Sequence, residues 1–185
     1  MNDQKKVEII LVETPSVEQS KKISALQKLC FVDVDDEEAE DDFYHLPTTQ
    51  VLAYVGKTLV GWAGVHVTEQ VYKGQQIKLG GYGICTHPDF RRMGIASKVA
   101  GEAMKYLKDE GCDVGFLSVN PKDEKSIKLH QKYGFKMLSQ HFSWTNSKGE
   151  IKEDSGGMLS PINSTDLFNF VLNSSDPLYV GNGYW

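Results

Sequence analysis

The sequence lacks the features that mark several common classes of protein. Its three cysteines, Cys30, Cys85 and Cys112, are widely spaced and form no CxxC motif or Cys/His cluster. This pattern argues against a disulfide framework and a structural zinc site, so we expect no bound metal. No apolar run approaches the ~20 residues of a membrane-spanning helix. The apolar stretch in the opening MNDQKKVEIILVE is too short for a signal peptide. We therefore expect a cytoplasmic protein with no membrane partner.

Basic residues are missing from one stretch, and acidic residues gather in the same place. No Lys or Arg lies between Lys28 and Lys57, and eight of the ten residues 33–42 are acidic. Without those eight, the chain would have 17 acidic and 20 basic side chains, so this acidic run accounts for the net charge of −5. A pI near 5.5 argues against nucleic acid as a partner. The acidic run is either a binding surface for a cationic molecule or a solvated face that keeps the protein soluble.

Hydrophobic periodicity and turn residues predict one domain, residues 1–185, in which strands and helices are mixed. The predicted strands are 7–12, 50–55, 58–67, 77–86, 114–119, 135–144 and 157–161. The predicted helices are 16–30, 94–110, 123–133 and 166–172, and an aromatic tail follows. This order predicts an α/β (α+β) fold with a mixed, mostly antiparallel central sheet flanked by helices.

The segment YGICTHPDFRRMGIA, residues 82–96, carries the strongest chemical signal. A predicted strand runs into a short loop with Arg91 and Arg92, and the clearest predicted helix begins at Gly94. The first turn of a helix presents unpaired backbone N–H groups and the positive end of the helix dipole. Together with two guanidinium groups, these donors favour binding of an anion such as a phosphate.

A second block follows that helix and has the form LSVNP, then SxxLHxxYGF. With both blocks present, the sequence resembles the GNAT superfamily of acetyl-CoA-dependent N-acetyltransferases. Arg91, Gly94 and Ala96 match the family's (Q/R)xxGx(G/A) pyrophosphate loop. The second block resembles LxVxPxNxxAxxLYxKxGF, with matches at Leu117, Val119, Pro121, Leu129, Lys132, Gly134 and Phe135. Asp123, Ser126 and His130 depart from that pattern.

The resemblance implies acetyl-CoA as cosubstrate and a set of residues that bind it. In this family the strand Ile84–Thr86 separates from the strand Leu117–Val119, and the pantetheine arm pairs with the exposed edge. The residues implied in cofactor binding are Ile84, Cys85, Thr86, Arg91, Arg92, Met93, Gly94, Ile95, Ala96 and Asn120. A backbone N–H near Ile84 or Cys85 would polarise the thioester carbonyl. Cys85 itself is expected in the core rather than as a covalent nucleophile.

The catalytic residues implied by the resemblance differ from the usual ones. Many members place a glutamate base on the fourth strand, where this chain has Tyr82. Tyrosine, with a reference pKa of about 10, is a poor base at neutral pH. His130 stands where the family has a tyrosine acid, and a histidine can donate a proton to the leaving thiolate. The alternative for His130 is a surface helix position. Tyr133 is the reserve acid, or a packing residue.

The later part of the chain is similar to the aminoglycoside 2'-N-acetyltransferase group within that superfamily. The similarity rests on the turn 72–74, the segment 153–156 and the C-terminal Gly-Tyr-Trp. It implies that carboxylates bind a cationic acceptor, with Asp35, Asp36, Asp154 and Trp185 as the residues expected there. The alternative for the aromatic tail is an apolar cover or a contact in a homodimer.

Two functions of different classes are therefore predicted. The first is an N-acetyltransferase that acts on a primary amine of a cationic small molecule such as an aminoglycoside or aminosugar, with polyamines and protein amines as further acceptors. The second is a GNAT-like module that binds acyl-CoA or a cationic ligand with little turnover, because the usual glutamate is missing.

Overall fold

The computed structural model describes residues 6–31 and 46–184. In chain order the elements are β1 (Val7–Val12), α1 (Val17–Cys30), β2 (Thr49–Val55), β3 (Thr58–Tyr72), β4 (Gln75–Thr86), the 3₁₀ turn η1 (Pro88–Phe90), α3 (Ile95–Asp109), β5 (Val114–Ser118), α4 (Glu124–Gln131), β6 (Lys136–Met137), β7 (Phe142–Thr145), β8 (Ile151–Asp154), β9 (Gly157–Pro161), α5 (Thr165–Leu172) and β10 (Leu178–Asn182). The acidic run lies outside the described residues.

The strands form two sheets. The larger has seven strands in the order β1-β2-β3-β4-β5-β9-β6, and the smaller has three in the order β10-β7-β8. In the larger sheet β4 and β5 are parallel and the other neighbours are antiparallel. The prediction of a mixed, mostly antiparallel central sheet with flanking helices is therefore confirmed.

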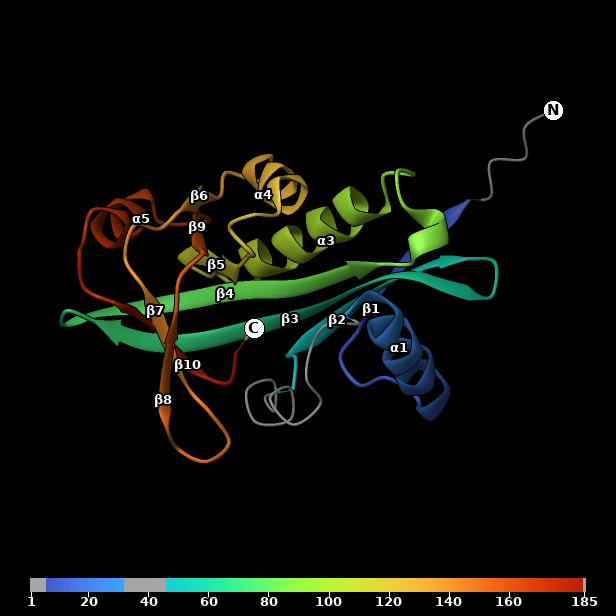
Figure 1. The fold of residues 1–185 in the computed structure, drawn as a ribbon, viewed down its shortest axis with the longest axis horizontal. Helices are drawn as coiled ribbons and strands as arrows, with labels where there is room; N and C mark the ends of the chain where they lie inside the picture. The colour runs from blue at the N-terminus through green and yellow to red at the C-terminus, as the bar shows by residue number, and fades with distance from the viewer. Residues whose placement is uncertain (1–5, 32–45, 185) are drawn as a thin grey trace.

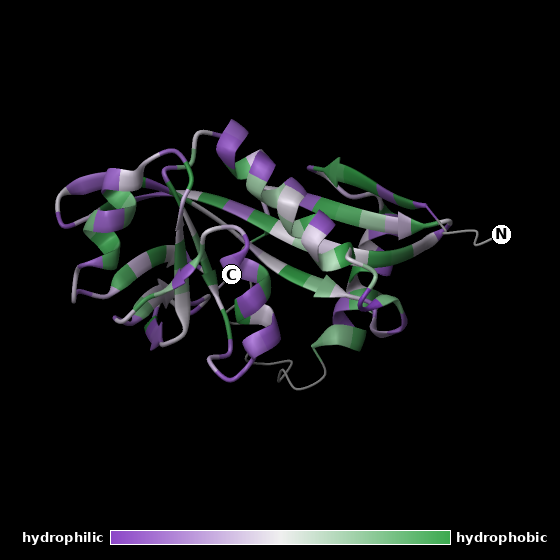
Figure 2. Ribbon diagram, turned by 90° about the horizontal axis from the view of Figure 1, so that it is seen from above, coloured by the Kyte–Doolittle hydropathy of each residue, from purple (hydrophilic) through white to green (hydrophobic). Residues whose placement is uncertain are grey.

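Helices and the smaller sheet cover the two faces of the central sheet (Figure 1). The helices α3 and α4 lie on one face, which we call the α3 face. Helix α1 and the strands β7, β8 and β10 lie on the other, which we call the α1 face. The hydrophobic colouring in Figure 2 follows the central strands, whereas the helices show hydrophilic bands between hydrophobic ones. This banding is what half-buried helices require.

Local sequence explains the elements that were predicted well. The Ser16 hydroxyl accepts from the Gln19 N–H and the Gln19 side chain accepts from the Ser16 N–H, a capping box that starts α1. Gly56 and Gly74, both at positive φ, lie in the turns that join β2 to β3 and β3 to β4. In α3 the apolar residues at every fourth position are buried against the sheet.

The prediction fails in the last third of the chain. The single strand predicted for 135–144 is two strands, β6 in the larger sheet and β7 in the smaller one. Between them the buried Gln140 donates to the Val171 carbonyl of α5 (2.8 Å), which holds the chain as it passes from one sheet to the other. The predicted aromatic tail contains a further strand, β10, and β8 was not predicted. Both strands pair with β7, a long-range contact that no local pattern reports.

No helix in the described ranges is long and apolar enough to cross a lipid bilayer.

Candidate active site

The centre of the candidate site is a place where two parallel strands separate. The strands β4 and β5 pair in register from Leu79 with Val114 to Gly81 with Phe116. Beyond Gly81, β4 continues to Thr86 while β5 continues to Ser118, and no further β4–β5 pair forms among the described residues. The backbone edge of β4 is thereby open over residues 82–86, as the resemblance implied. An open strand edge can pair with an amide-bearing chain.

The open edge leads to the basic loop and the first turn of α3. Gly94 is the N-cap of α3 at φ 73°, and Arg92 also has a positive φ of 66°. The first helical backbone bond runs from the Lys98 N–H to the Gly94 carbonyl (3.1 Å), so the N–H groups of residues 95–97 precede the helical ladder. Arg91 is exposed, and its Nε donates to the Thr86 carbonyl (3.4 Å) at the end of β4. The loop therefore has the donors and the charge of an anion site.

The side chains at this edge offer a ligand fewer polar groups than the backbone does. Ile95 is 1% exposed and packs on the α3 face, so it can offer a ligand only its backbone N–H. Ile84 and Ala96 are half-buried, and Met93 is exposed. The Thr86 hydroxyl is buried and has no hydrogen-bond partner within the described residues. A buried hydroxyl without a partner is costly.

Cys85 is placed as a core residue. It packs with Ile23 and Leu26 of α1 on the α1 face, and burial raises the pKa of its thiol. A thiol held in its neutral form is a weak nucleophile, which agrees with the expectation that Cys85 does not form a covalent intermediate.

Tyr82 and His130, predicted separately, form a buried pair. The Tyr82 hydroxyl lies 3.1 Å from His130 Nδ1, and the two residues are 2% and 3% exposed. Phe135 packs edge-on against both rings. Burial lowers the pKa of His130 to about 4 and raises the pKa of Tyr82 above its ordinary value. At neutral pH both groups are uncharged, and the surface-helix alternative for His130 does not hold because its side chain is in the core.

Tyr133 joins α4 to α3. Its hydroxyl donates to the carbonyl of Ser97 in the first turn of α3, and partial burial raises the pKa of the phenol. Asn120 is exposed at the end of β5, where its side chain accepts from the Lys122 N–H (2.9 Å) and so shapes the turn before α4. Tyr133 thus fixes the segment after α4 to the start of α3, and Asn120 lies in the turn that follows β5.

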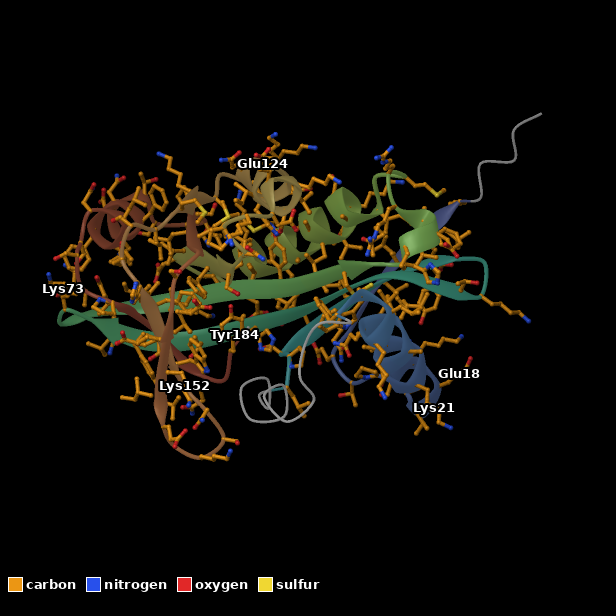
Figure 3. The ribbon with its side chains drawn as sticks, viewed as in Figure 1. Glu18, Lys21, Lys73, Glu124, Lys152 and Tyr184 are labelled. Atoms are coloured by element: carbon orange, nitrogen blue, oxygen red, sulfur yellow. The ribbon has the colours of Figure 1, made fainter. Side chains whose placement is uncertain are left out.

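The predicted acceptor residues are placed only in part. Asp154 is exposed at the end of β8, where its carboxylate accepts from the Ser155 N–H (2.6 Å). Asp35, Asp36 and Trp185 lie outside the described residues. The last described residue, Tyr184, is labelled in Figure 3. It packs edge-on against Trp144 with 4.7 Å between ring centroids. Its backbone neighbour Gly183 donates to Thr145 of β7 (2.9 Å), so the chain before Trp185 is fixed to the smaller sheet.

One residue near the opening was missed by the sequence analysis. His66 of β3 is in register with Gly81 of β4, the last residue before the strands separate, and is 9% exposed. A histidine amid the apolar and β-branched residues of a central strand is the signal that could have drawn attention to it. No group of three or more metal-ligating side chains is found in the described part of the chain.

Comparison with known proteins agrees with this geometry. Residues 20–135 match the model of the acetyltransferase (GNAT) family. The chain belongs to the GNAT family. Among curated relatives, thialysine N-epsilon-acetyltransferase of Bos taurus is 26% identical over 109 residues, 57% of this chain and 63% of the relative. The Sus scrofa protein of the same name is 24% identical over 115 residues, 60% of this chain and 66% of the relative. The match therefore spans a little under two thirds of each relative.

Solved structures share the GNAT fold at low sequence identity. The GNAT family N-acetyltransferase YhbS of Escherichia coli, in complex with CoA, has a TM-score of 0.65 at 16% identity and covers 98% of this chain and 92% of its own. An aminoglycoside acetyltransferase, meta-AAC0020 from an uncultured soil metagenomic sample, has a TM-score of 0.52 at 15% identity, covering 68% of this chain and 86% of its own. These likenesses confirm the GNAT fold of the chain.

Proposed function

We propose that this GNAT protein is an N-acetyltransferase that moves the acetyl group of acetyl-CoA to a primary amine of a cationic small molecule. The observation that carries the proposal is the opening of β4 from β5 beyond Gly81, continuous with the α3 N-terminus. At about 3.3 Å per residue, residues 82–86 offer an edge roughly 16 Å long. The pantetheine arm would pair along this edge, and the pyrophosphate would accept from the N–H groups of residues 95–97.

The Tyr82–His130 pair supports the leaving thiolate in this proposal. Because the pKa of His130 is about 4, its imidazole is neutral at pH 7 and is not a cationic acid. In this mechanism the Tyr82 hydroxyl, 3.1 Å from Nδ1, would donate to that nitrogen, and the imidazole proton would reside on Nε2. That N–H would donate a hydrogen bond to the thiolate as it forms, and the thiolate would then take its proton from water. Tyr82 thus fixes the tautomer and does not act as a base.

The proposal also names the class of amine that accepts the acetyl group. The curated relatives are named for acetylation of an N-epsilon amine of thialysine, and one structural neighbour is an aminoglycoside acetyltransferase. Both names describe acetylation of amino compounds, and the acidic run of this chain suits a cationic acceptor. An aminosugar is the first class to test, with polyamines and protein amines next.

A binding module with little turnover is the second candidate, and one observation favours it. On the described part of β4, no carboxylate lies beside the opening. The test is release of CoA, followed with a thiol reagent, against a panel of aminoglycosides, simple aminosugars, polyamines, thialysine and lysine-containing peptides. Turnover of a cationic small molecule supports the enzyme. Binding of acetyl-CoA without CoA release on any amine would refute it and leave the binding module.

Removal of the two loop guanidinium groups should weaken acetyl-CoA binding about ten- to thirtyfold. Hydrogen bonds to charged groups contribute about 1.5–3 kcal/mol, and exposure of the loop reduces this. The variant is Arg91→Gln/Arg92→Asn, because asparagine tolerates the positive φ at position 92. Calorimetric titration with acetyl-CoA at low salt gives the dissociation constants, and the difference should shrink at high salt.

The matched control is Lys21→Gln/Lys125→Gln, which lowers the net charge equally at exposed positions on α1 and α4. Lys21 is labelled on α1 in Figure 3. If both double variants weakened binding equally, net charge and not the loop would be responsible.

A further inference from the structure

Acetylation of a protonated amine requires a base, and β4 does not supply one. Tyr82 belongs to the core cluster of α3, so its side chain lies on the α3 face. There it is 2% exposed and hydrogen-bonded to His130. On the α1 face, β4 contributes Leu79, Gly81, Gly83 and Cys85, since alternate residues of a strand share a face and Cys85 packs against α1. None of these four carries a basic group suited to neutral pH.

The neighbouring strand β3 carries a histidine close to this face. Trp62 packs with Cys85 on the α1 face, and the β3–β4 register pairs Trp62 with Cys85, Gly64 with Gly83 and His66 with Gly81. His66 therefore shares the α1 face with these residues, one strand away from the place where β4 and β5 separate. Thr68 and Gln70, the following β3 residues on this face, do not titrate. His66 is thus the imidazole that β3 presents beside the opening.

The surface next to His66 leaves room for a small amine. Among the described residues, a side chain at Gly83 would meet a single neighbour within 4 Å, the Trp62 ring at 4.0 Å. The Trp62 ring also lies over Gly64, and its N–H donates to the Gln50 side chain (2.7 Å), which fixes the ring in place. The result is a half-buried stretch of β4 backbone at Gly83, beside a fixed indole and two residues from Gly81, which pairs with His66. Indole rings attract ammonium groups, so this place suits a cationic amine.

We propose that His66 is the catalytic base that takes the proton from the acceptor amine. This proposal rests on the proposed acetyltransferase function. The acceptor enters on the α1 face over Gly83, and the His66 imidazole takes one proton from its ammonium group. The neutral nitrogen then forms a bond to the thioester carbonyl carbon, and the carbon–sulfur bond breaks. The thiolate leaves as CoA and takes a proton from water, while the amide nitrogen and protonated His66 release the remaining protons to solvent.

The test compares wild type with His66→Gln and His66→Asn on amines of different basicity. Both variants have a polar side chain that does not titrate. If one of them fails to fold, the other can still be used for the test. General-base catalysis contributes about 10²–10⁴-fold. We expect kcat/KM to fall about a hundredfold for an alkyl amine with a pKa near 10, and less than about tenfold for an analogue with a pKa near 6 to 7. The affinity for acetyl-CoA should not change.

The control is Thr68→Val, on the same strand and face, which should leave kcat/KM within about threefold for every amine. The role of His66 would be overturned if kcat/KM in the His66 variants fell equally for all amines, if it did not fall, or if the variants lost acetyl-CoA binding. Turnover by the wild type would in each case leave the proposed function intact. If the wild-type protein released no CoA with any amine of the panel, that result would refute the proposed function, and the role of His66 with it.

Discussion

Gly156→Ala is expected to destabilise the protein by about 3 kcal/mol or more. A Cβ atom at Gly156 would lie 2.4 Å from the carbonyl oxygen of Val119 and 3.1 Å from Pro121, and Gly156 has a φ of 89°. The clash is with backbone, so no side-chain rotation relieves it, and strained backbone adds of order 1–3 kcal/mol. The Gly156 carbonyl also accepts from the Val119 N–H (3.0 Å), a bond that secures the end of β5. Urea unfolding followed by circular dichroism measures the loss.

Gly149→Ala is the matched control for this prediction. Gly149 has a similar φ of 77°, but nothing lies within 4 Å of a Cβ atom there. Only the conformational cost of about 1 kcal/mol should appear in that variant. Equal losses in the two variants would show that the clash with Val119 is relieved by movement of the chain. Because β5 borders the opening, Gly156→Ala should also weaken acetyl-CoA binding, whereas Gly149→Ala should not.

Acidification should destabilise the protein through His130 by up to about 3 kcal/mol between pH 6.5 and pH 4. The folded pKa of about 4 lies below the reference value of 6.5, so over this window the unfolded chain binds a proton that the folded chain excludes. Well above pH 6.5 neither state is protonated, and the contribution vanishes. The free energy of unfolding, measured from pH 7.5 to pH 4.5, should therefore fall as the pH falls.

His130→Asn isolates the contribution of this group. The asparagine side chain does not titrate and can still accept a hydrogen bond from Tyr82. The carboxylates titrate alike in wild type and variant, so their effect cancels in the difference between the two proteins. We expect the gap in unfolding free energy between wild type and variant to shrink on acidification by about 1–3 kcal/mol. Parallel curves would mean that His130 is protonated in the folded state near its ordinary pKa. His141, 60% exposed in its side chain, serves as the surface control through His141→Asn.

These two predictions concern groups on either side of the same opening. Gly156 secures β5, and His130 holds Tyr82 on the α3 face. In the proposed mechanism a neutral His130 gives the thiolate a hydrogen bond and not a proton, and the amine loses its proton on the other face. The separation of the two roles onto opposite faces of β4 follows from strand alternation.

The sequence by itself determined the parts that depend on local chemistry. The helix over 95–109 follows from apolar residues at every fourth position. The loop before it is predicted to bind an anion because two arginines and a glycine precede a helix start. The hairpins at Gly56 and Gly74 follow from turn residues that tolerate positive φ. These features involve residues close in sequence, so the residues that decide them stand in one segment.

The tertiary structure alone decided which side chains meet. Tyr82 and His130 are 48 residues apart, and their pairing depends on which faces of β4 and α4 are buried. The register of β3 against β4 brings His66 opposite Gly81, and a shift of one residue would turn its side chain to the α3 face. The smaller sheet arises because β7 lies between β8 and β10, and the segment that precedes β7 looks like one continuous strand in the sequence. Register and long-range pairing result from packing of the whole chain, and so the base proposed for this GNAT protein was visible only in the folded structure.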